Sequence, residues 1–213
     1  YAIRLRVPLV QLPGDTAWGW DAKAPFALAE SWLGTALSDD DSPAALVRRY
    51  LAAFGPATPT DAACWLGLRG LRATFDALRP ELMTFRDERG RELFDLPDAP
   101  RPDGDVDAPV RFLPEFDNLV LGHDDRTRVV APEHRPYLFT RNLLVPATFL
   151  VDGVVAGTWT STCKRGVATL TLTPFGKLTK PVQRELRDEG LALLRFVEEG
   201  AKDHVIAFDA PAA

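Results

Sequence analysis

The chain has 213 residues, of which 46% are hydrophobic and 26% are charged. This composition excludes a wholly disordered protein, and no apolar run reaches the roughly 18 to 20 residues that would cross a membrane. The net charge of -5 argues against a protein that grips nucleic acid by bulk charge alone. Cys64 and Cys163 stand far apart and outside any CxxC motif, so we expect neither a disulfide framework nor a cysteine zinc site, and a reducing, cytoplasmic location.

The first segment predicts a two-stranded hairpin without helices of its own. Residues 4–12 and 25–31 have the composition of strands, and the loop between them is rich in Pro, Gly and Trp. A two-stranded ribbon is marginal in water by itself. Since the sequence also begins at Tyr1 rather than at a methionine, we expect residues 1–37 to be the wing of a preceding winged helix that lies outside this sequence.

Residues 38–97 predict a complete winged helix. Ser42 precedes a helix whose apolar residues recur at helical spacing, and Thr58 begins a second helix with a capping box. A third helix ends before Pro80, and a strand–turn–strand pattern follows over 82–96. Three helices and a hairpin are the order of a winged helix, whose third helix enters the DNA major groove in helix-turn-helix proteins.

The rest of the chain predicts a linker and then a small antiparallel β-barrel-like domain, which makes the fold class α+β. Residues 98–109 are rich in Pro, Asp and Gly and show no periodicity, as in a linker. Asp152 and Gly153 form the strongest hairpin-turn signal of the domain, which spans residues 110–209. The expected elements are strands at 110–113, 118–121, 147–151, 154–160 and 167–173, a helix from Thr179 to about Glu199, and an edge strand at 205–208.

Five blocks of the sequence match a known family in order along nearly the whole chain. They are VPLVQLP at 7–13, ALAESWLG at 27–34, YLAAFGPA at 50–57, FLPEFDNL at 112–119 and FLVDG at 149–153. Together they resemble the actinobacterial winged-helix DNA-binding domain proteins related to the AlkZ and YcaQ DNA glycosylases. The resemblance implies tandem winged helices followed by a β-barrel, a concave surface for double-stranded DNA, including alkylated DNA, and excision of alkylated or cross-linked bases.

One feature of that family is missing from these residues. Its catalytic signature places two polar residues around one apolar residue, typically as Gln-x-Gln or Gln-x-Asp. The glutamines here are Gln11 and Gln183, and neither stands in such a motif. The resemblance therefore implies a catalytic motif upstream of Tyr1. We predict no cofactor. Two readings stay open, a DNA glycosylase and a non-enzymatic winged-helix DNA-binding or regulatory protein.

Eight polar residues are candidate DNA contacts, because Arg and Lys neutralise phosphates and Arg reads guanine edges. They are Arg69, Arg72 and Arg79 on the third helix, Arg89 and Arg91 in the wing, Asn118, and Lys164 and Arg165 in a later turn. Such a basic turn between strands is the kind of ribbon that enters a minor groove. The alternative is that these charges solvate a helix face or a sheet edge. Residues 43–97 carry eight positive and seven negative charges, so packing against protein is a further alternative for the winged helix.

Asp117 is the candidate catalytic residue. A carboxylate in a partly apolar site can have a raised pKa, and glycosylase chemistry needs a group that orients water or stabilises the sugar cation. The alternative role is an Asx-turn that closes the bend after Pro114. His123 and the two aspartates after it match no common zinc spacing, so we predict no metal site.

Overall fold

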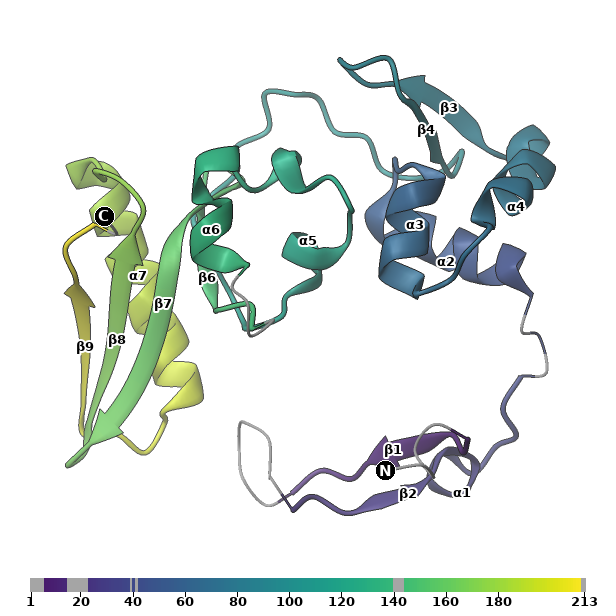
Figure 1. The fold of residues 1–213 in the computed structure, drawn as a ribbon. Helices are drawn as coiled ribbons and strands as arrows, with labels where there is room; N and C mark the ends of the chain where they lie inside the picture. The colour runs from purple at the N-terminus through teal and green to yellow at the C-terminus, as the bar shows by residue number, and fades with distance from the viewer. Residues whose placement is uncertain (1–5, 15–22, 39, 41, 140–143, 212–213) are drawn as a thin grey trace. The chain divides into compact units, whose positions relative to one another are not determined.

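A computed structural model of the chain describes residues 6–14, 23–38, 40, 42–139 and 144–211. It divides into two compact units, Tyr1–Ser42 and Pro43–Ala213, and its α+β class is the predicted one (Figure 1). The beginning of the first expected strand and most of the loop after it lie outside the described residues. Among the helices in the described ranges, none is long and apolar enough to cross a membrane.

The first unit contains a short hairpin and a short helix. Strand β1 (Leu9–Gln11) pairs antiparallel with β2 (Phe26–Leu28), which confirms the centre of the predicted hairpin. Helix α1 (Ala29–Leu33) follows at once, so the expectation of a strand over 25–31 with no helix is wrong for its last residues. The reason is local, because Ala, Glu and Leu favour helix and Gly34 ends it in the left-handed conformation that suits a C-terminal cap.

The second unit opens with three helices and a hairpin, in the predicted order. The elements are α2 (Pro43–Phe54), α3 (Pro59–Leu66), α4 (Leu71–Leu78), the 3-10 turn η2 (Arg79–Glu81), β3 (Met83–Arg86) and β4 (Glu92–Asp95). Strands β3 and β4 pair antiparallel. One apolar core joins these elements through Val47, Tyr50, Leu51, Leu71, Phe75, Leu78 and Phe94. Most of the apolar residues predicted at helical spacing are therefore buried, whereas Trp65 and Leu68 are exposed and Phe54 and Leu66 are partly buried.

A segment of short helices follows the linker. The linker residues 98–109 form no helix or strand, as predicted. Residues 118–121, expected as a strand, are instead helix α5 (Asn118–Leu121). The physical reason is a cap, because the Asp117 carboxylate accepts the N–H of Leu119 at 2.8 Å. After α5 come η3 (Arg126–Arg128), η4 (Pro132–His134) and α6 (Arg135–Leu138).

The remaining strands form one five-stranded mixed sheet. They are β5 (Arg111–Leu113), β6 (Thr148–Val151), β7 (Val154–Lys164), β8 (Val167–Pro174) and β9 (Asp203–Phe208), paired in that order. The Asp152–Gly153 turn joins β6 to β7 as predicted. Strands β5 and β9 are the two edges and do not pair with one another among the described residues, so the closure expected of a barrel is not observed.

Helix α7 (Lys180–Val197) explains why the sheet is mixed rather than antiparallel. It carries the chain from β8 back along the sheet, and a crossover of this kind makes β9 parallel to β8. Leu186 and Leu194 of α7 pack with Phe149 and Leu170 in one buried core. Figure 1 shows α7 lying along one face of the sheet.

Candidate nucleic-acid interface

The arginines predicted on the third helix lie at the surface, and two of the three are engaged with carboxylates. Arg72 contacts Asp76 at 3.3 Å. Arg79 donates two hydrogen bonds of 2.8 Å to Glu92, which raises the pKa of Arg79. Arg69 is exposed and makes no ion pair with any residue that the structure describes. Of these three candidates, Arg69 alone needs no rearrangement to meet a phosphate.

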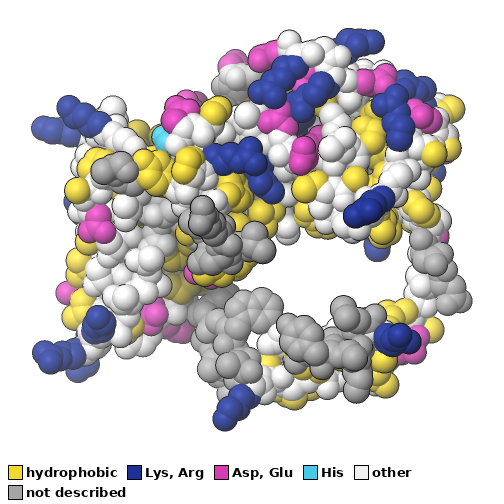
Figure 2. Space-filling view, viewed as in Figure 1, with side chains coloured by type: hydrophobic (Ala, Val, Ile, Leu, Met, Phe, Trp, Pro, Cys, Tyr) yellow, Lys and Arg dark blue, Asp and Glu magenta, His cyan; other side chains and the backbone are white. Residues whose placement is uncertain are grey.

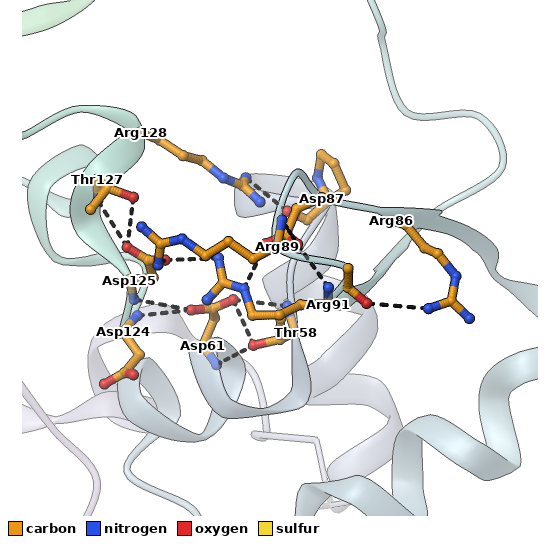
Figure 3. A network of polar contacts seen from close by, with 12 residues as sticks. Thr58, Asp61, Arg86, Asp87, Arg89, Arg91, Asp124, Asp125, Thr127 and Arg128 are labelled. Carbon is orange, nitrogen blue, oxygen red and sulfur yellow. Dashed lines mark hydrogen bonds and ion pairs between the residues drawn. The ribbon is translucent and has the colours of Figure 1, made fainter.

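The wing arginines converge on a single carboxylate that sequence reasoning missed (Figure 3). Arg89 Nη1 and Arg91 Nη2 lie 2.8 and 2.7 Å from the same Asp125 oxygen. Arg91 Nε also donates to Asp87 at 2.6 Å. A hydrogen bond from the Thr127 hydroxyl, followed by the charges of both arginines, lowers the pKa of Asp125 to about 2. The wing is therefore joined to the turn η3 by a charged network.

Asp61 connects the same turn to helix α3. The side chain of Thr58 accepts the Asp61 N–H, and the Asp61 carboxylate accepts the Thr58 N–H at 2.8 Å, which is the predicted capping box. The other Asp61 oxygen accepts the backbone N–H groups of Asp124 at 3.0 Å and Asp125 at 3.4 Å. Burial by itself raises the pKa of Asp61, but the hydrogen bonds from Thr58 and Asp125 outweigh it and the net shift is downward.

An aromatic cluster lies next to this network and consists of Tyr50, Phe54, Trp65 and His123. The hydroxyl of buried Tyr50 donates to the carbonyl oxygen of Gly122 at 2.7 Å, and burial raises the pKa of Tyr50. The His123 ring nitrogen Nε2 lies 3.0 Å from the carbonyl oxygen of Phe54, and burial lowers the pKa of His123. His123 thus packs between two chain segments. The sequence did not indicate this role, because Phe54 lies 69 residues before His123.

Asn118 and Asp117 both take part in ordering helix α5. The Asn118 side-chain oxygen accepts the indole N–H of Trp65 at 3.1 Å, which leaves its amide N–H₂ without a contact among the described residues. Asp117 caps the helix and is half-buried. Its observed contact is the one expected of the Asx-turn alternative, while its catalytic role stays a prediction.

A groove of about 490 Å³ lies between the wing and η3. Four arginines line it, namely Arg86, Arg89, Arg91 and Arg128, together with Asp87 and Glu88. Arg86 and Arg128 donate to backbone carbonyl oxygens rather than to carboxylates. On the face drawn in Figure 2, basic and acidic side chains are interspersed over the helical part, so it carries no continuous basic patch there.

Lys164 ends β7, and Arg165 and Gly166 form the turn to β8. The side chains of Lys164 and Arg165 are exposed, and neither makes an ion pair with a described residue. Arg165 and Gly166 have φ of 52° and 81°, the left-handed values that a tight two-residue hairpin turn requires. The backbone N–H of Lys202 donates to Gly166 at 2.7 Å and fixes the turn to the start of β9. Two uncompensated cations therefore stand at the end of the longest hairpin in the described chain.

Comparison with known proteins gives one family. A family model described as "DNA glycosylase AlkZ-like" matches residues 1–196. The chain is 33% identical over 129 residues to a curated protein of Streptomyces sahachiroi described as "Interstrand DNA cross-link repair glycosylase", an alignment that covers 56% of this chain and 34% of that relative. The solved structure of Streptomyces sahachiroi DNA glycosylase AlkZ is similar in fold, with a TM-score of 0.67 and 24% identity. The match covers 87% of this chain and 52% of the solved chain. The chain thus spans about half of the solved structure and about a third of the curated relative.

Proposed function

Because this chain belongs to the AlkZ-like DNA glycosylase family, we propose that it binds double-stranded DNA as part of a protein that excises alkylated or cross-linked bases. The observation that carries the proposal is the family match over residues 1–196, which spans both compact units. The name of the curated Streptomyces relative supports the same class of substrate.

The predicted contact arginines and lysine fall into two groups, those with a carboxylate partner and those without one among the described residues. Lys164 and Arg165 at the β7–β8 turn, with Arg69 before α4, are the unpaired cations among the predicted contacts and would hold the DNA backbone. Arg72, Arg79, Arg89 and Arg91 would position the wing and helices through their carboxylate partners. We assign residues 38–97 to a winged helix, residues 1–37 to the wing of another, and residues 110–209 to the β domain.

The reaction is hydrolysis of the N-glycosidic bond. Alkylation at N7 gives guanine a positive charge, so the base leaves as a neutral molecule while the sugar develops cationic character at its anomeric carbon. A positioned polar group then orients the water that attacks this carbon and accepts its proton. Since neither Gln11 nor Gln183 stands in a Gln-x-Gln motif, we place that group outside these residues, and Asp117 would stabilise the sugar cation.

The experiment is release of base from alkylated duplex DNA by the protein encoded in the full reading frame. We expect free N7-methylguanine, measured by liquid chromatography and mass spectrometry, and a Gln-x-Gln-type motif in the sequence before Tyr1. Salt-dependent binding of the duplex without base release would favour the non-enzymatic DNA-binding protein instead. That second candidate rests on one observation, that four of the five candidate DNA-contact arginines in residues 38–97 are paired with carboxylates. If the protein neither binds the duplex nor releases a base, both candidate functions are overturned.

A further inference from the structure

A small cavity between η3 and η4 is lined by two arginines whose side chains make no hydrogen bond with any residue that the structure describes. Its volume is about 90 Å³, and Arg126 and Arg135 line it together with Asp125, Thr127, Val130 and Pro132. The Arg126 Nε atom is buried and makes no hydrogen bond. The Arg135 side chain is exposed and contacts no carboxylate of the described residues. Neither arginine was a candidate in the sequence.

The acidic residue of this cavity does not neutralise them. One Asp125 oxygen accepts the hydroxyl and the N–H of Thr127, at 2.7 and 3.1 Å. The other oxygen is shared by Arg89 and Arg91 of the wing. Arginine stays protonated at any physiological pH. Within the part of the chain that the structure describes, two positive charges therefore remain without a counterion at the cavity.

The Arg126 guanidinium is held in place from its other side. It stacks over the ring of Phe139, with its central carbon 4.3 Å from the ring centroid. A planar group held in this way loses little conformational entropy when it binds a ligand. Because its buried Nε–H has no acceptor among the described residues, the Arg126 guanidinium carries a charge that no protein group offsets, and an anion in the cavity would offset it.

We propose that this cavity is a binding site for one phosphate group, held by Arg126 and Arg135. The size agrees, since a cavity of about 90 Å³ is on the scale of one small anion. The chemistry agrees because guanidinium groups bind phosphate oxygens through paired, charge-assisted hydrogen bonds. The inference rests on the proposed function for its ligand, a phosphodiester of duplex DNA, although free phosphate has the same chemistry.

The test compares Arg126→Gln and Arg135→Gln with Arg195→Gln, an exposed α7 arginine that provides the same change in charge. Since Arg135 is exposed, its variant folds even if loss of the Phe139 contact destabilises the Arg126 variant, and thermal melting checks both. In the first arm, inorganic phosphate is titrated against the 213-residue chain and the Arg Nε–H resonances are followed by NMR. We expect the Arg126 signal to shift with phosphate but not with chloride at equal ionic strength, and about a tenfold weaker affinity in Arg135→Gln.

The second arm measures binding of an unmodified DNA duplex over a range of salt concentrations. Loss of one phosphate contact lowers the slope of log K against log salt by about 0.9, in the two test variants and not in Arg195→Gln. This result identifies the DNA backbone as the ligand, whereas a phosphate shift with an unchanged slope identifies free phosphate. If the test variants match Arg195→Gln in both arms, the site is refuted. If the wild-type chain binds no duplex, the proposed function fails while the phosphate titration still decides the site.

Discussion

The carboxylate of Asp61 accepts a hydrogen bond from the backbone N–H of Asp124 at 3.0 Å, although 63 residues separate the two in sequence. The same carboxylate closes the capping box of α3 with Thr58. A residue that begins a helix therefore also holds the turn η3, where the wing arginines meet Asp125. The candidate interface depends on this connection, because it orients groups from three distant segments.

Replacement of Asp61 by alanine tests this connection. Asp61→Ala removes the cap and leaves buried N–H groups without acceptors, so we expect the free energy of unfolding to fall by about 3 kcal/mol. Urea denaturation measures it. Asp188→Ala, on the exposed side of α7, is the control and should change stability by less than about 0.5 kcal/mol. Equal effects of the two substitutions would show that Asp61 contributes nothing beyond an exposed aspartate.

Stability in acid should depend on Asp125. Its pKa is lowered from 3.8 to about 2 in the folded state, so its contribution is complete above about pH 4 and is lost as the pH falls toward 2. The contribution is at most about 2.5 kcal/mol, since the shift is about 1.8 pKa units and one unit is about 1.4 kcal/mol. Unfolding measured between pH 5 and pH 2 should show the difference between wild type and Asp125→Asn shrinking over that window. A difference that stays constant with pH would contradict the assigned shift.

The sheet tolerates no side chain at Gly157. A Cβ there would lie 2.5 Å from two ring carbons of Phe149 and from the carbonyl oxygen of Thr173. Gly157→Ala should therefore lower the free energy of unfolding by about 2 kcal/mol, the usual cost of overpacking a core. Gly176→Ala is the matched control, because a Cβ at Gly176 meets nothing within 4 Å. If thermal melting gave the same midpoint for both variants, the close packing of β7 on Phe149 would be in doubt.

The β7–β8 turn should contribute phosphate contacts to DNA binding. Arg165→Asn keeps a residue that accepts the left-handed φ of 52°, and Lys164→Gln keeps the length of the side chain. Each substitution should lower duplex affinity at low salt and reduce the slope of log K against log salt by about 0.9. Fluorescence anisotropy with a labelled duplex measures both quantities. Slopes equal to that of Arg195→Gln would mean that the turn charges only keep the sheet edge soluble.

Features set by near neighbours were predictable from the sequence. The periodicity of α2 and α4, the capping box at Thr58 and the Asp152–Gly153 turn all depend on residues a few positions apart. Their physical causes, which are hydrogen bonds at helix ends and the backbone angles of tight turns, act within one or two turns of chain. Each of them is present in the structure.

Tertiary structure decided the features whose partners are distant along the chain. Helix α5 has a local cap at Asp117, but the hydrogen bond that Trp65 donates to Asn118 joins residues 53 positions apart, and the apolar run 118–121 also suited a strand. The α7 crossover made β9 parallel and left the sheet open. Arg89 lies 36 residues before the carboxylate of Asp125 that it contacts. The sequence alone determined which residues are charged, but only the fold decided which charges neutralise one another and which stay free to bind a ligand.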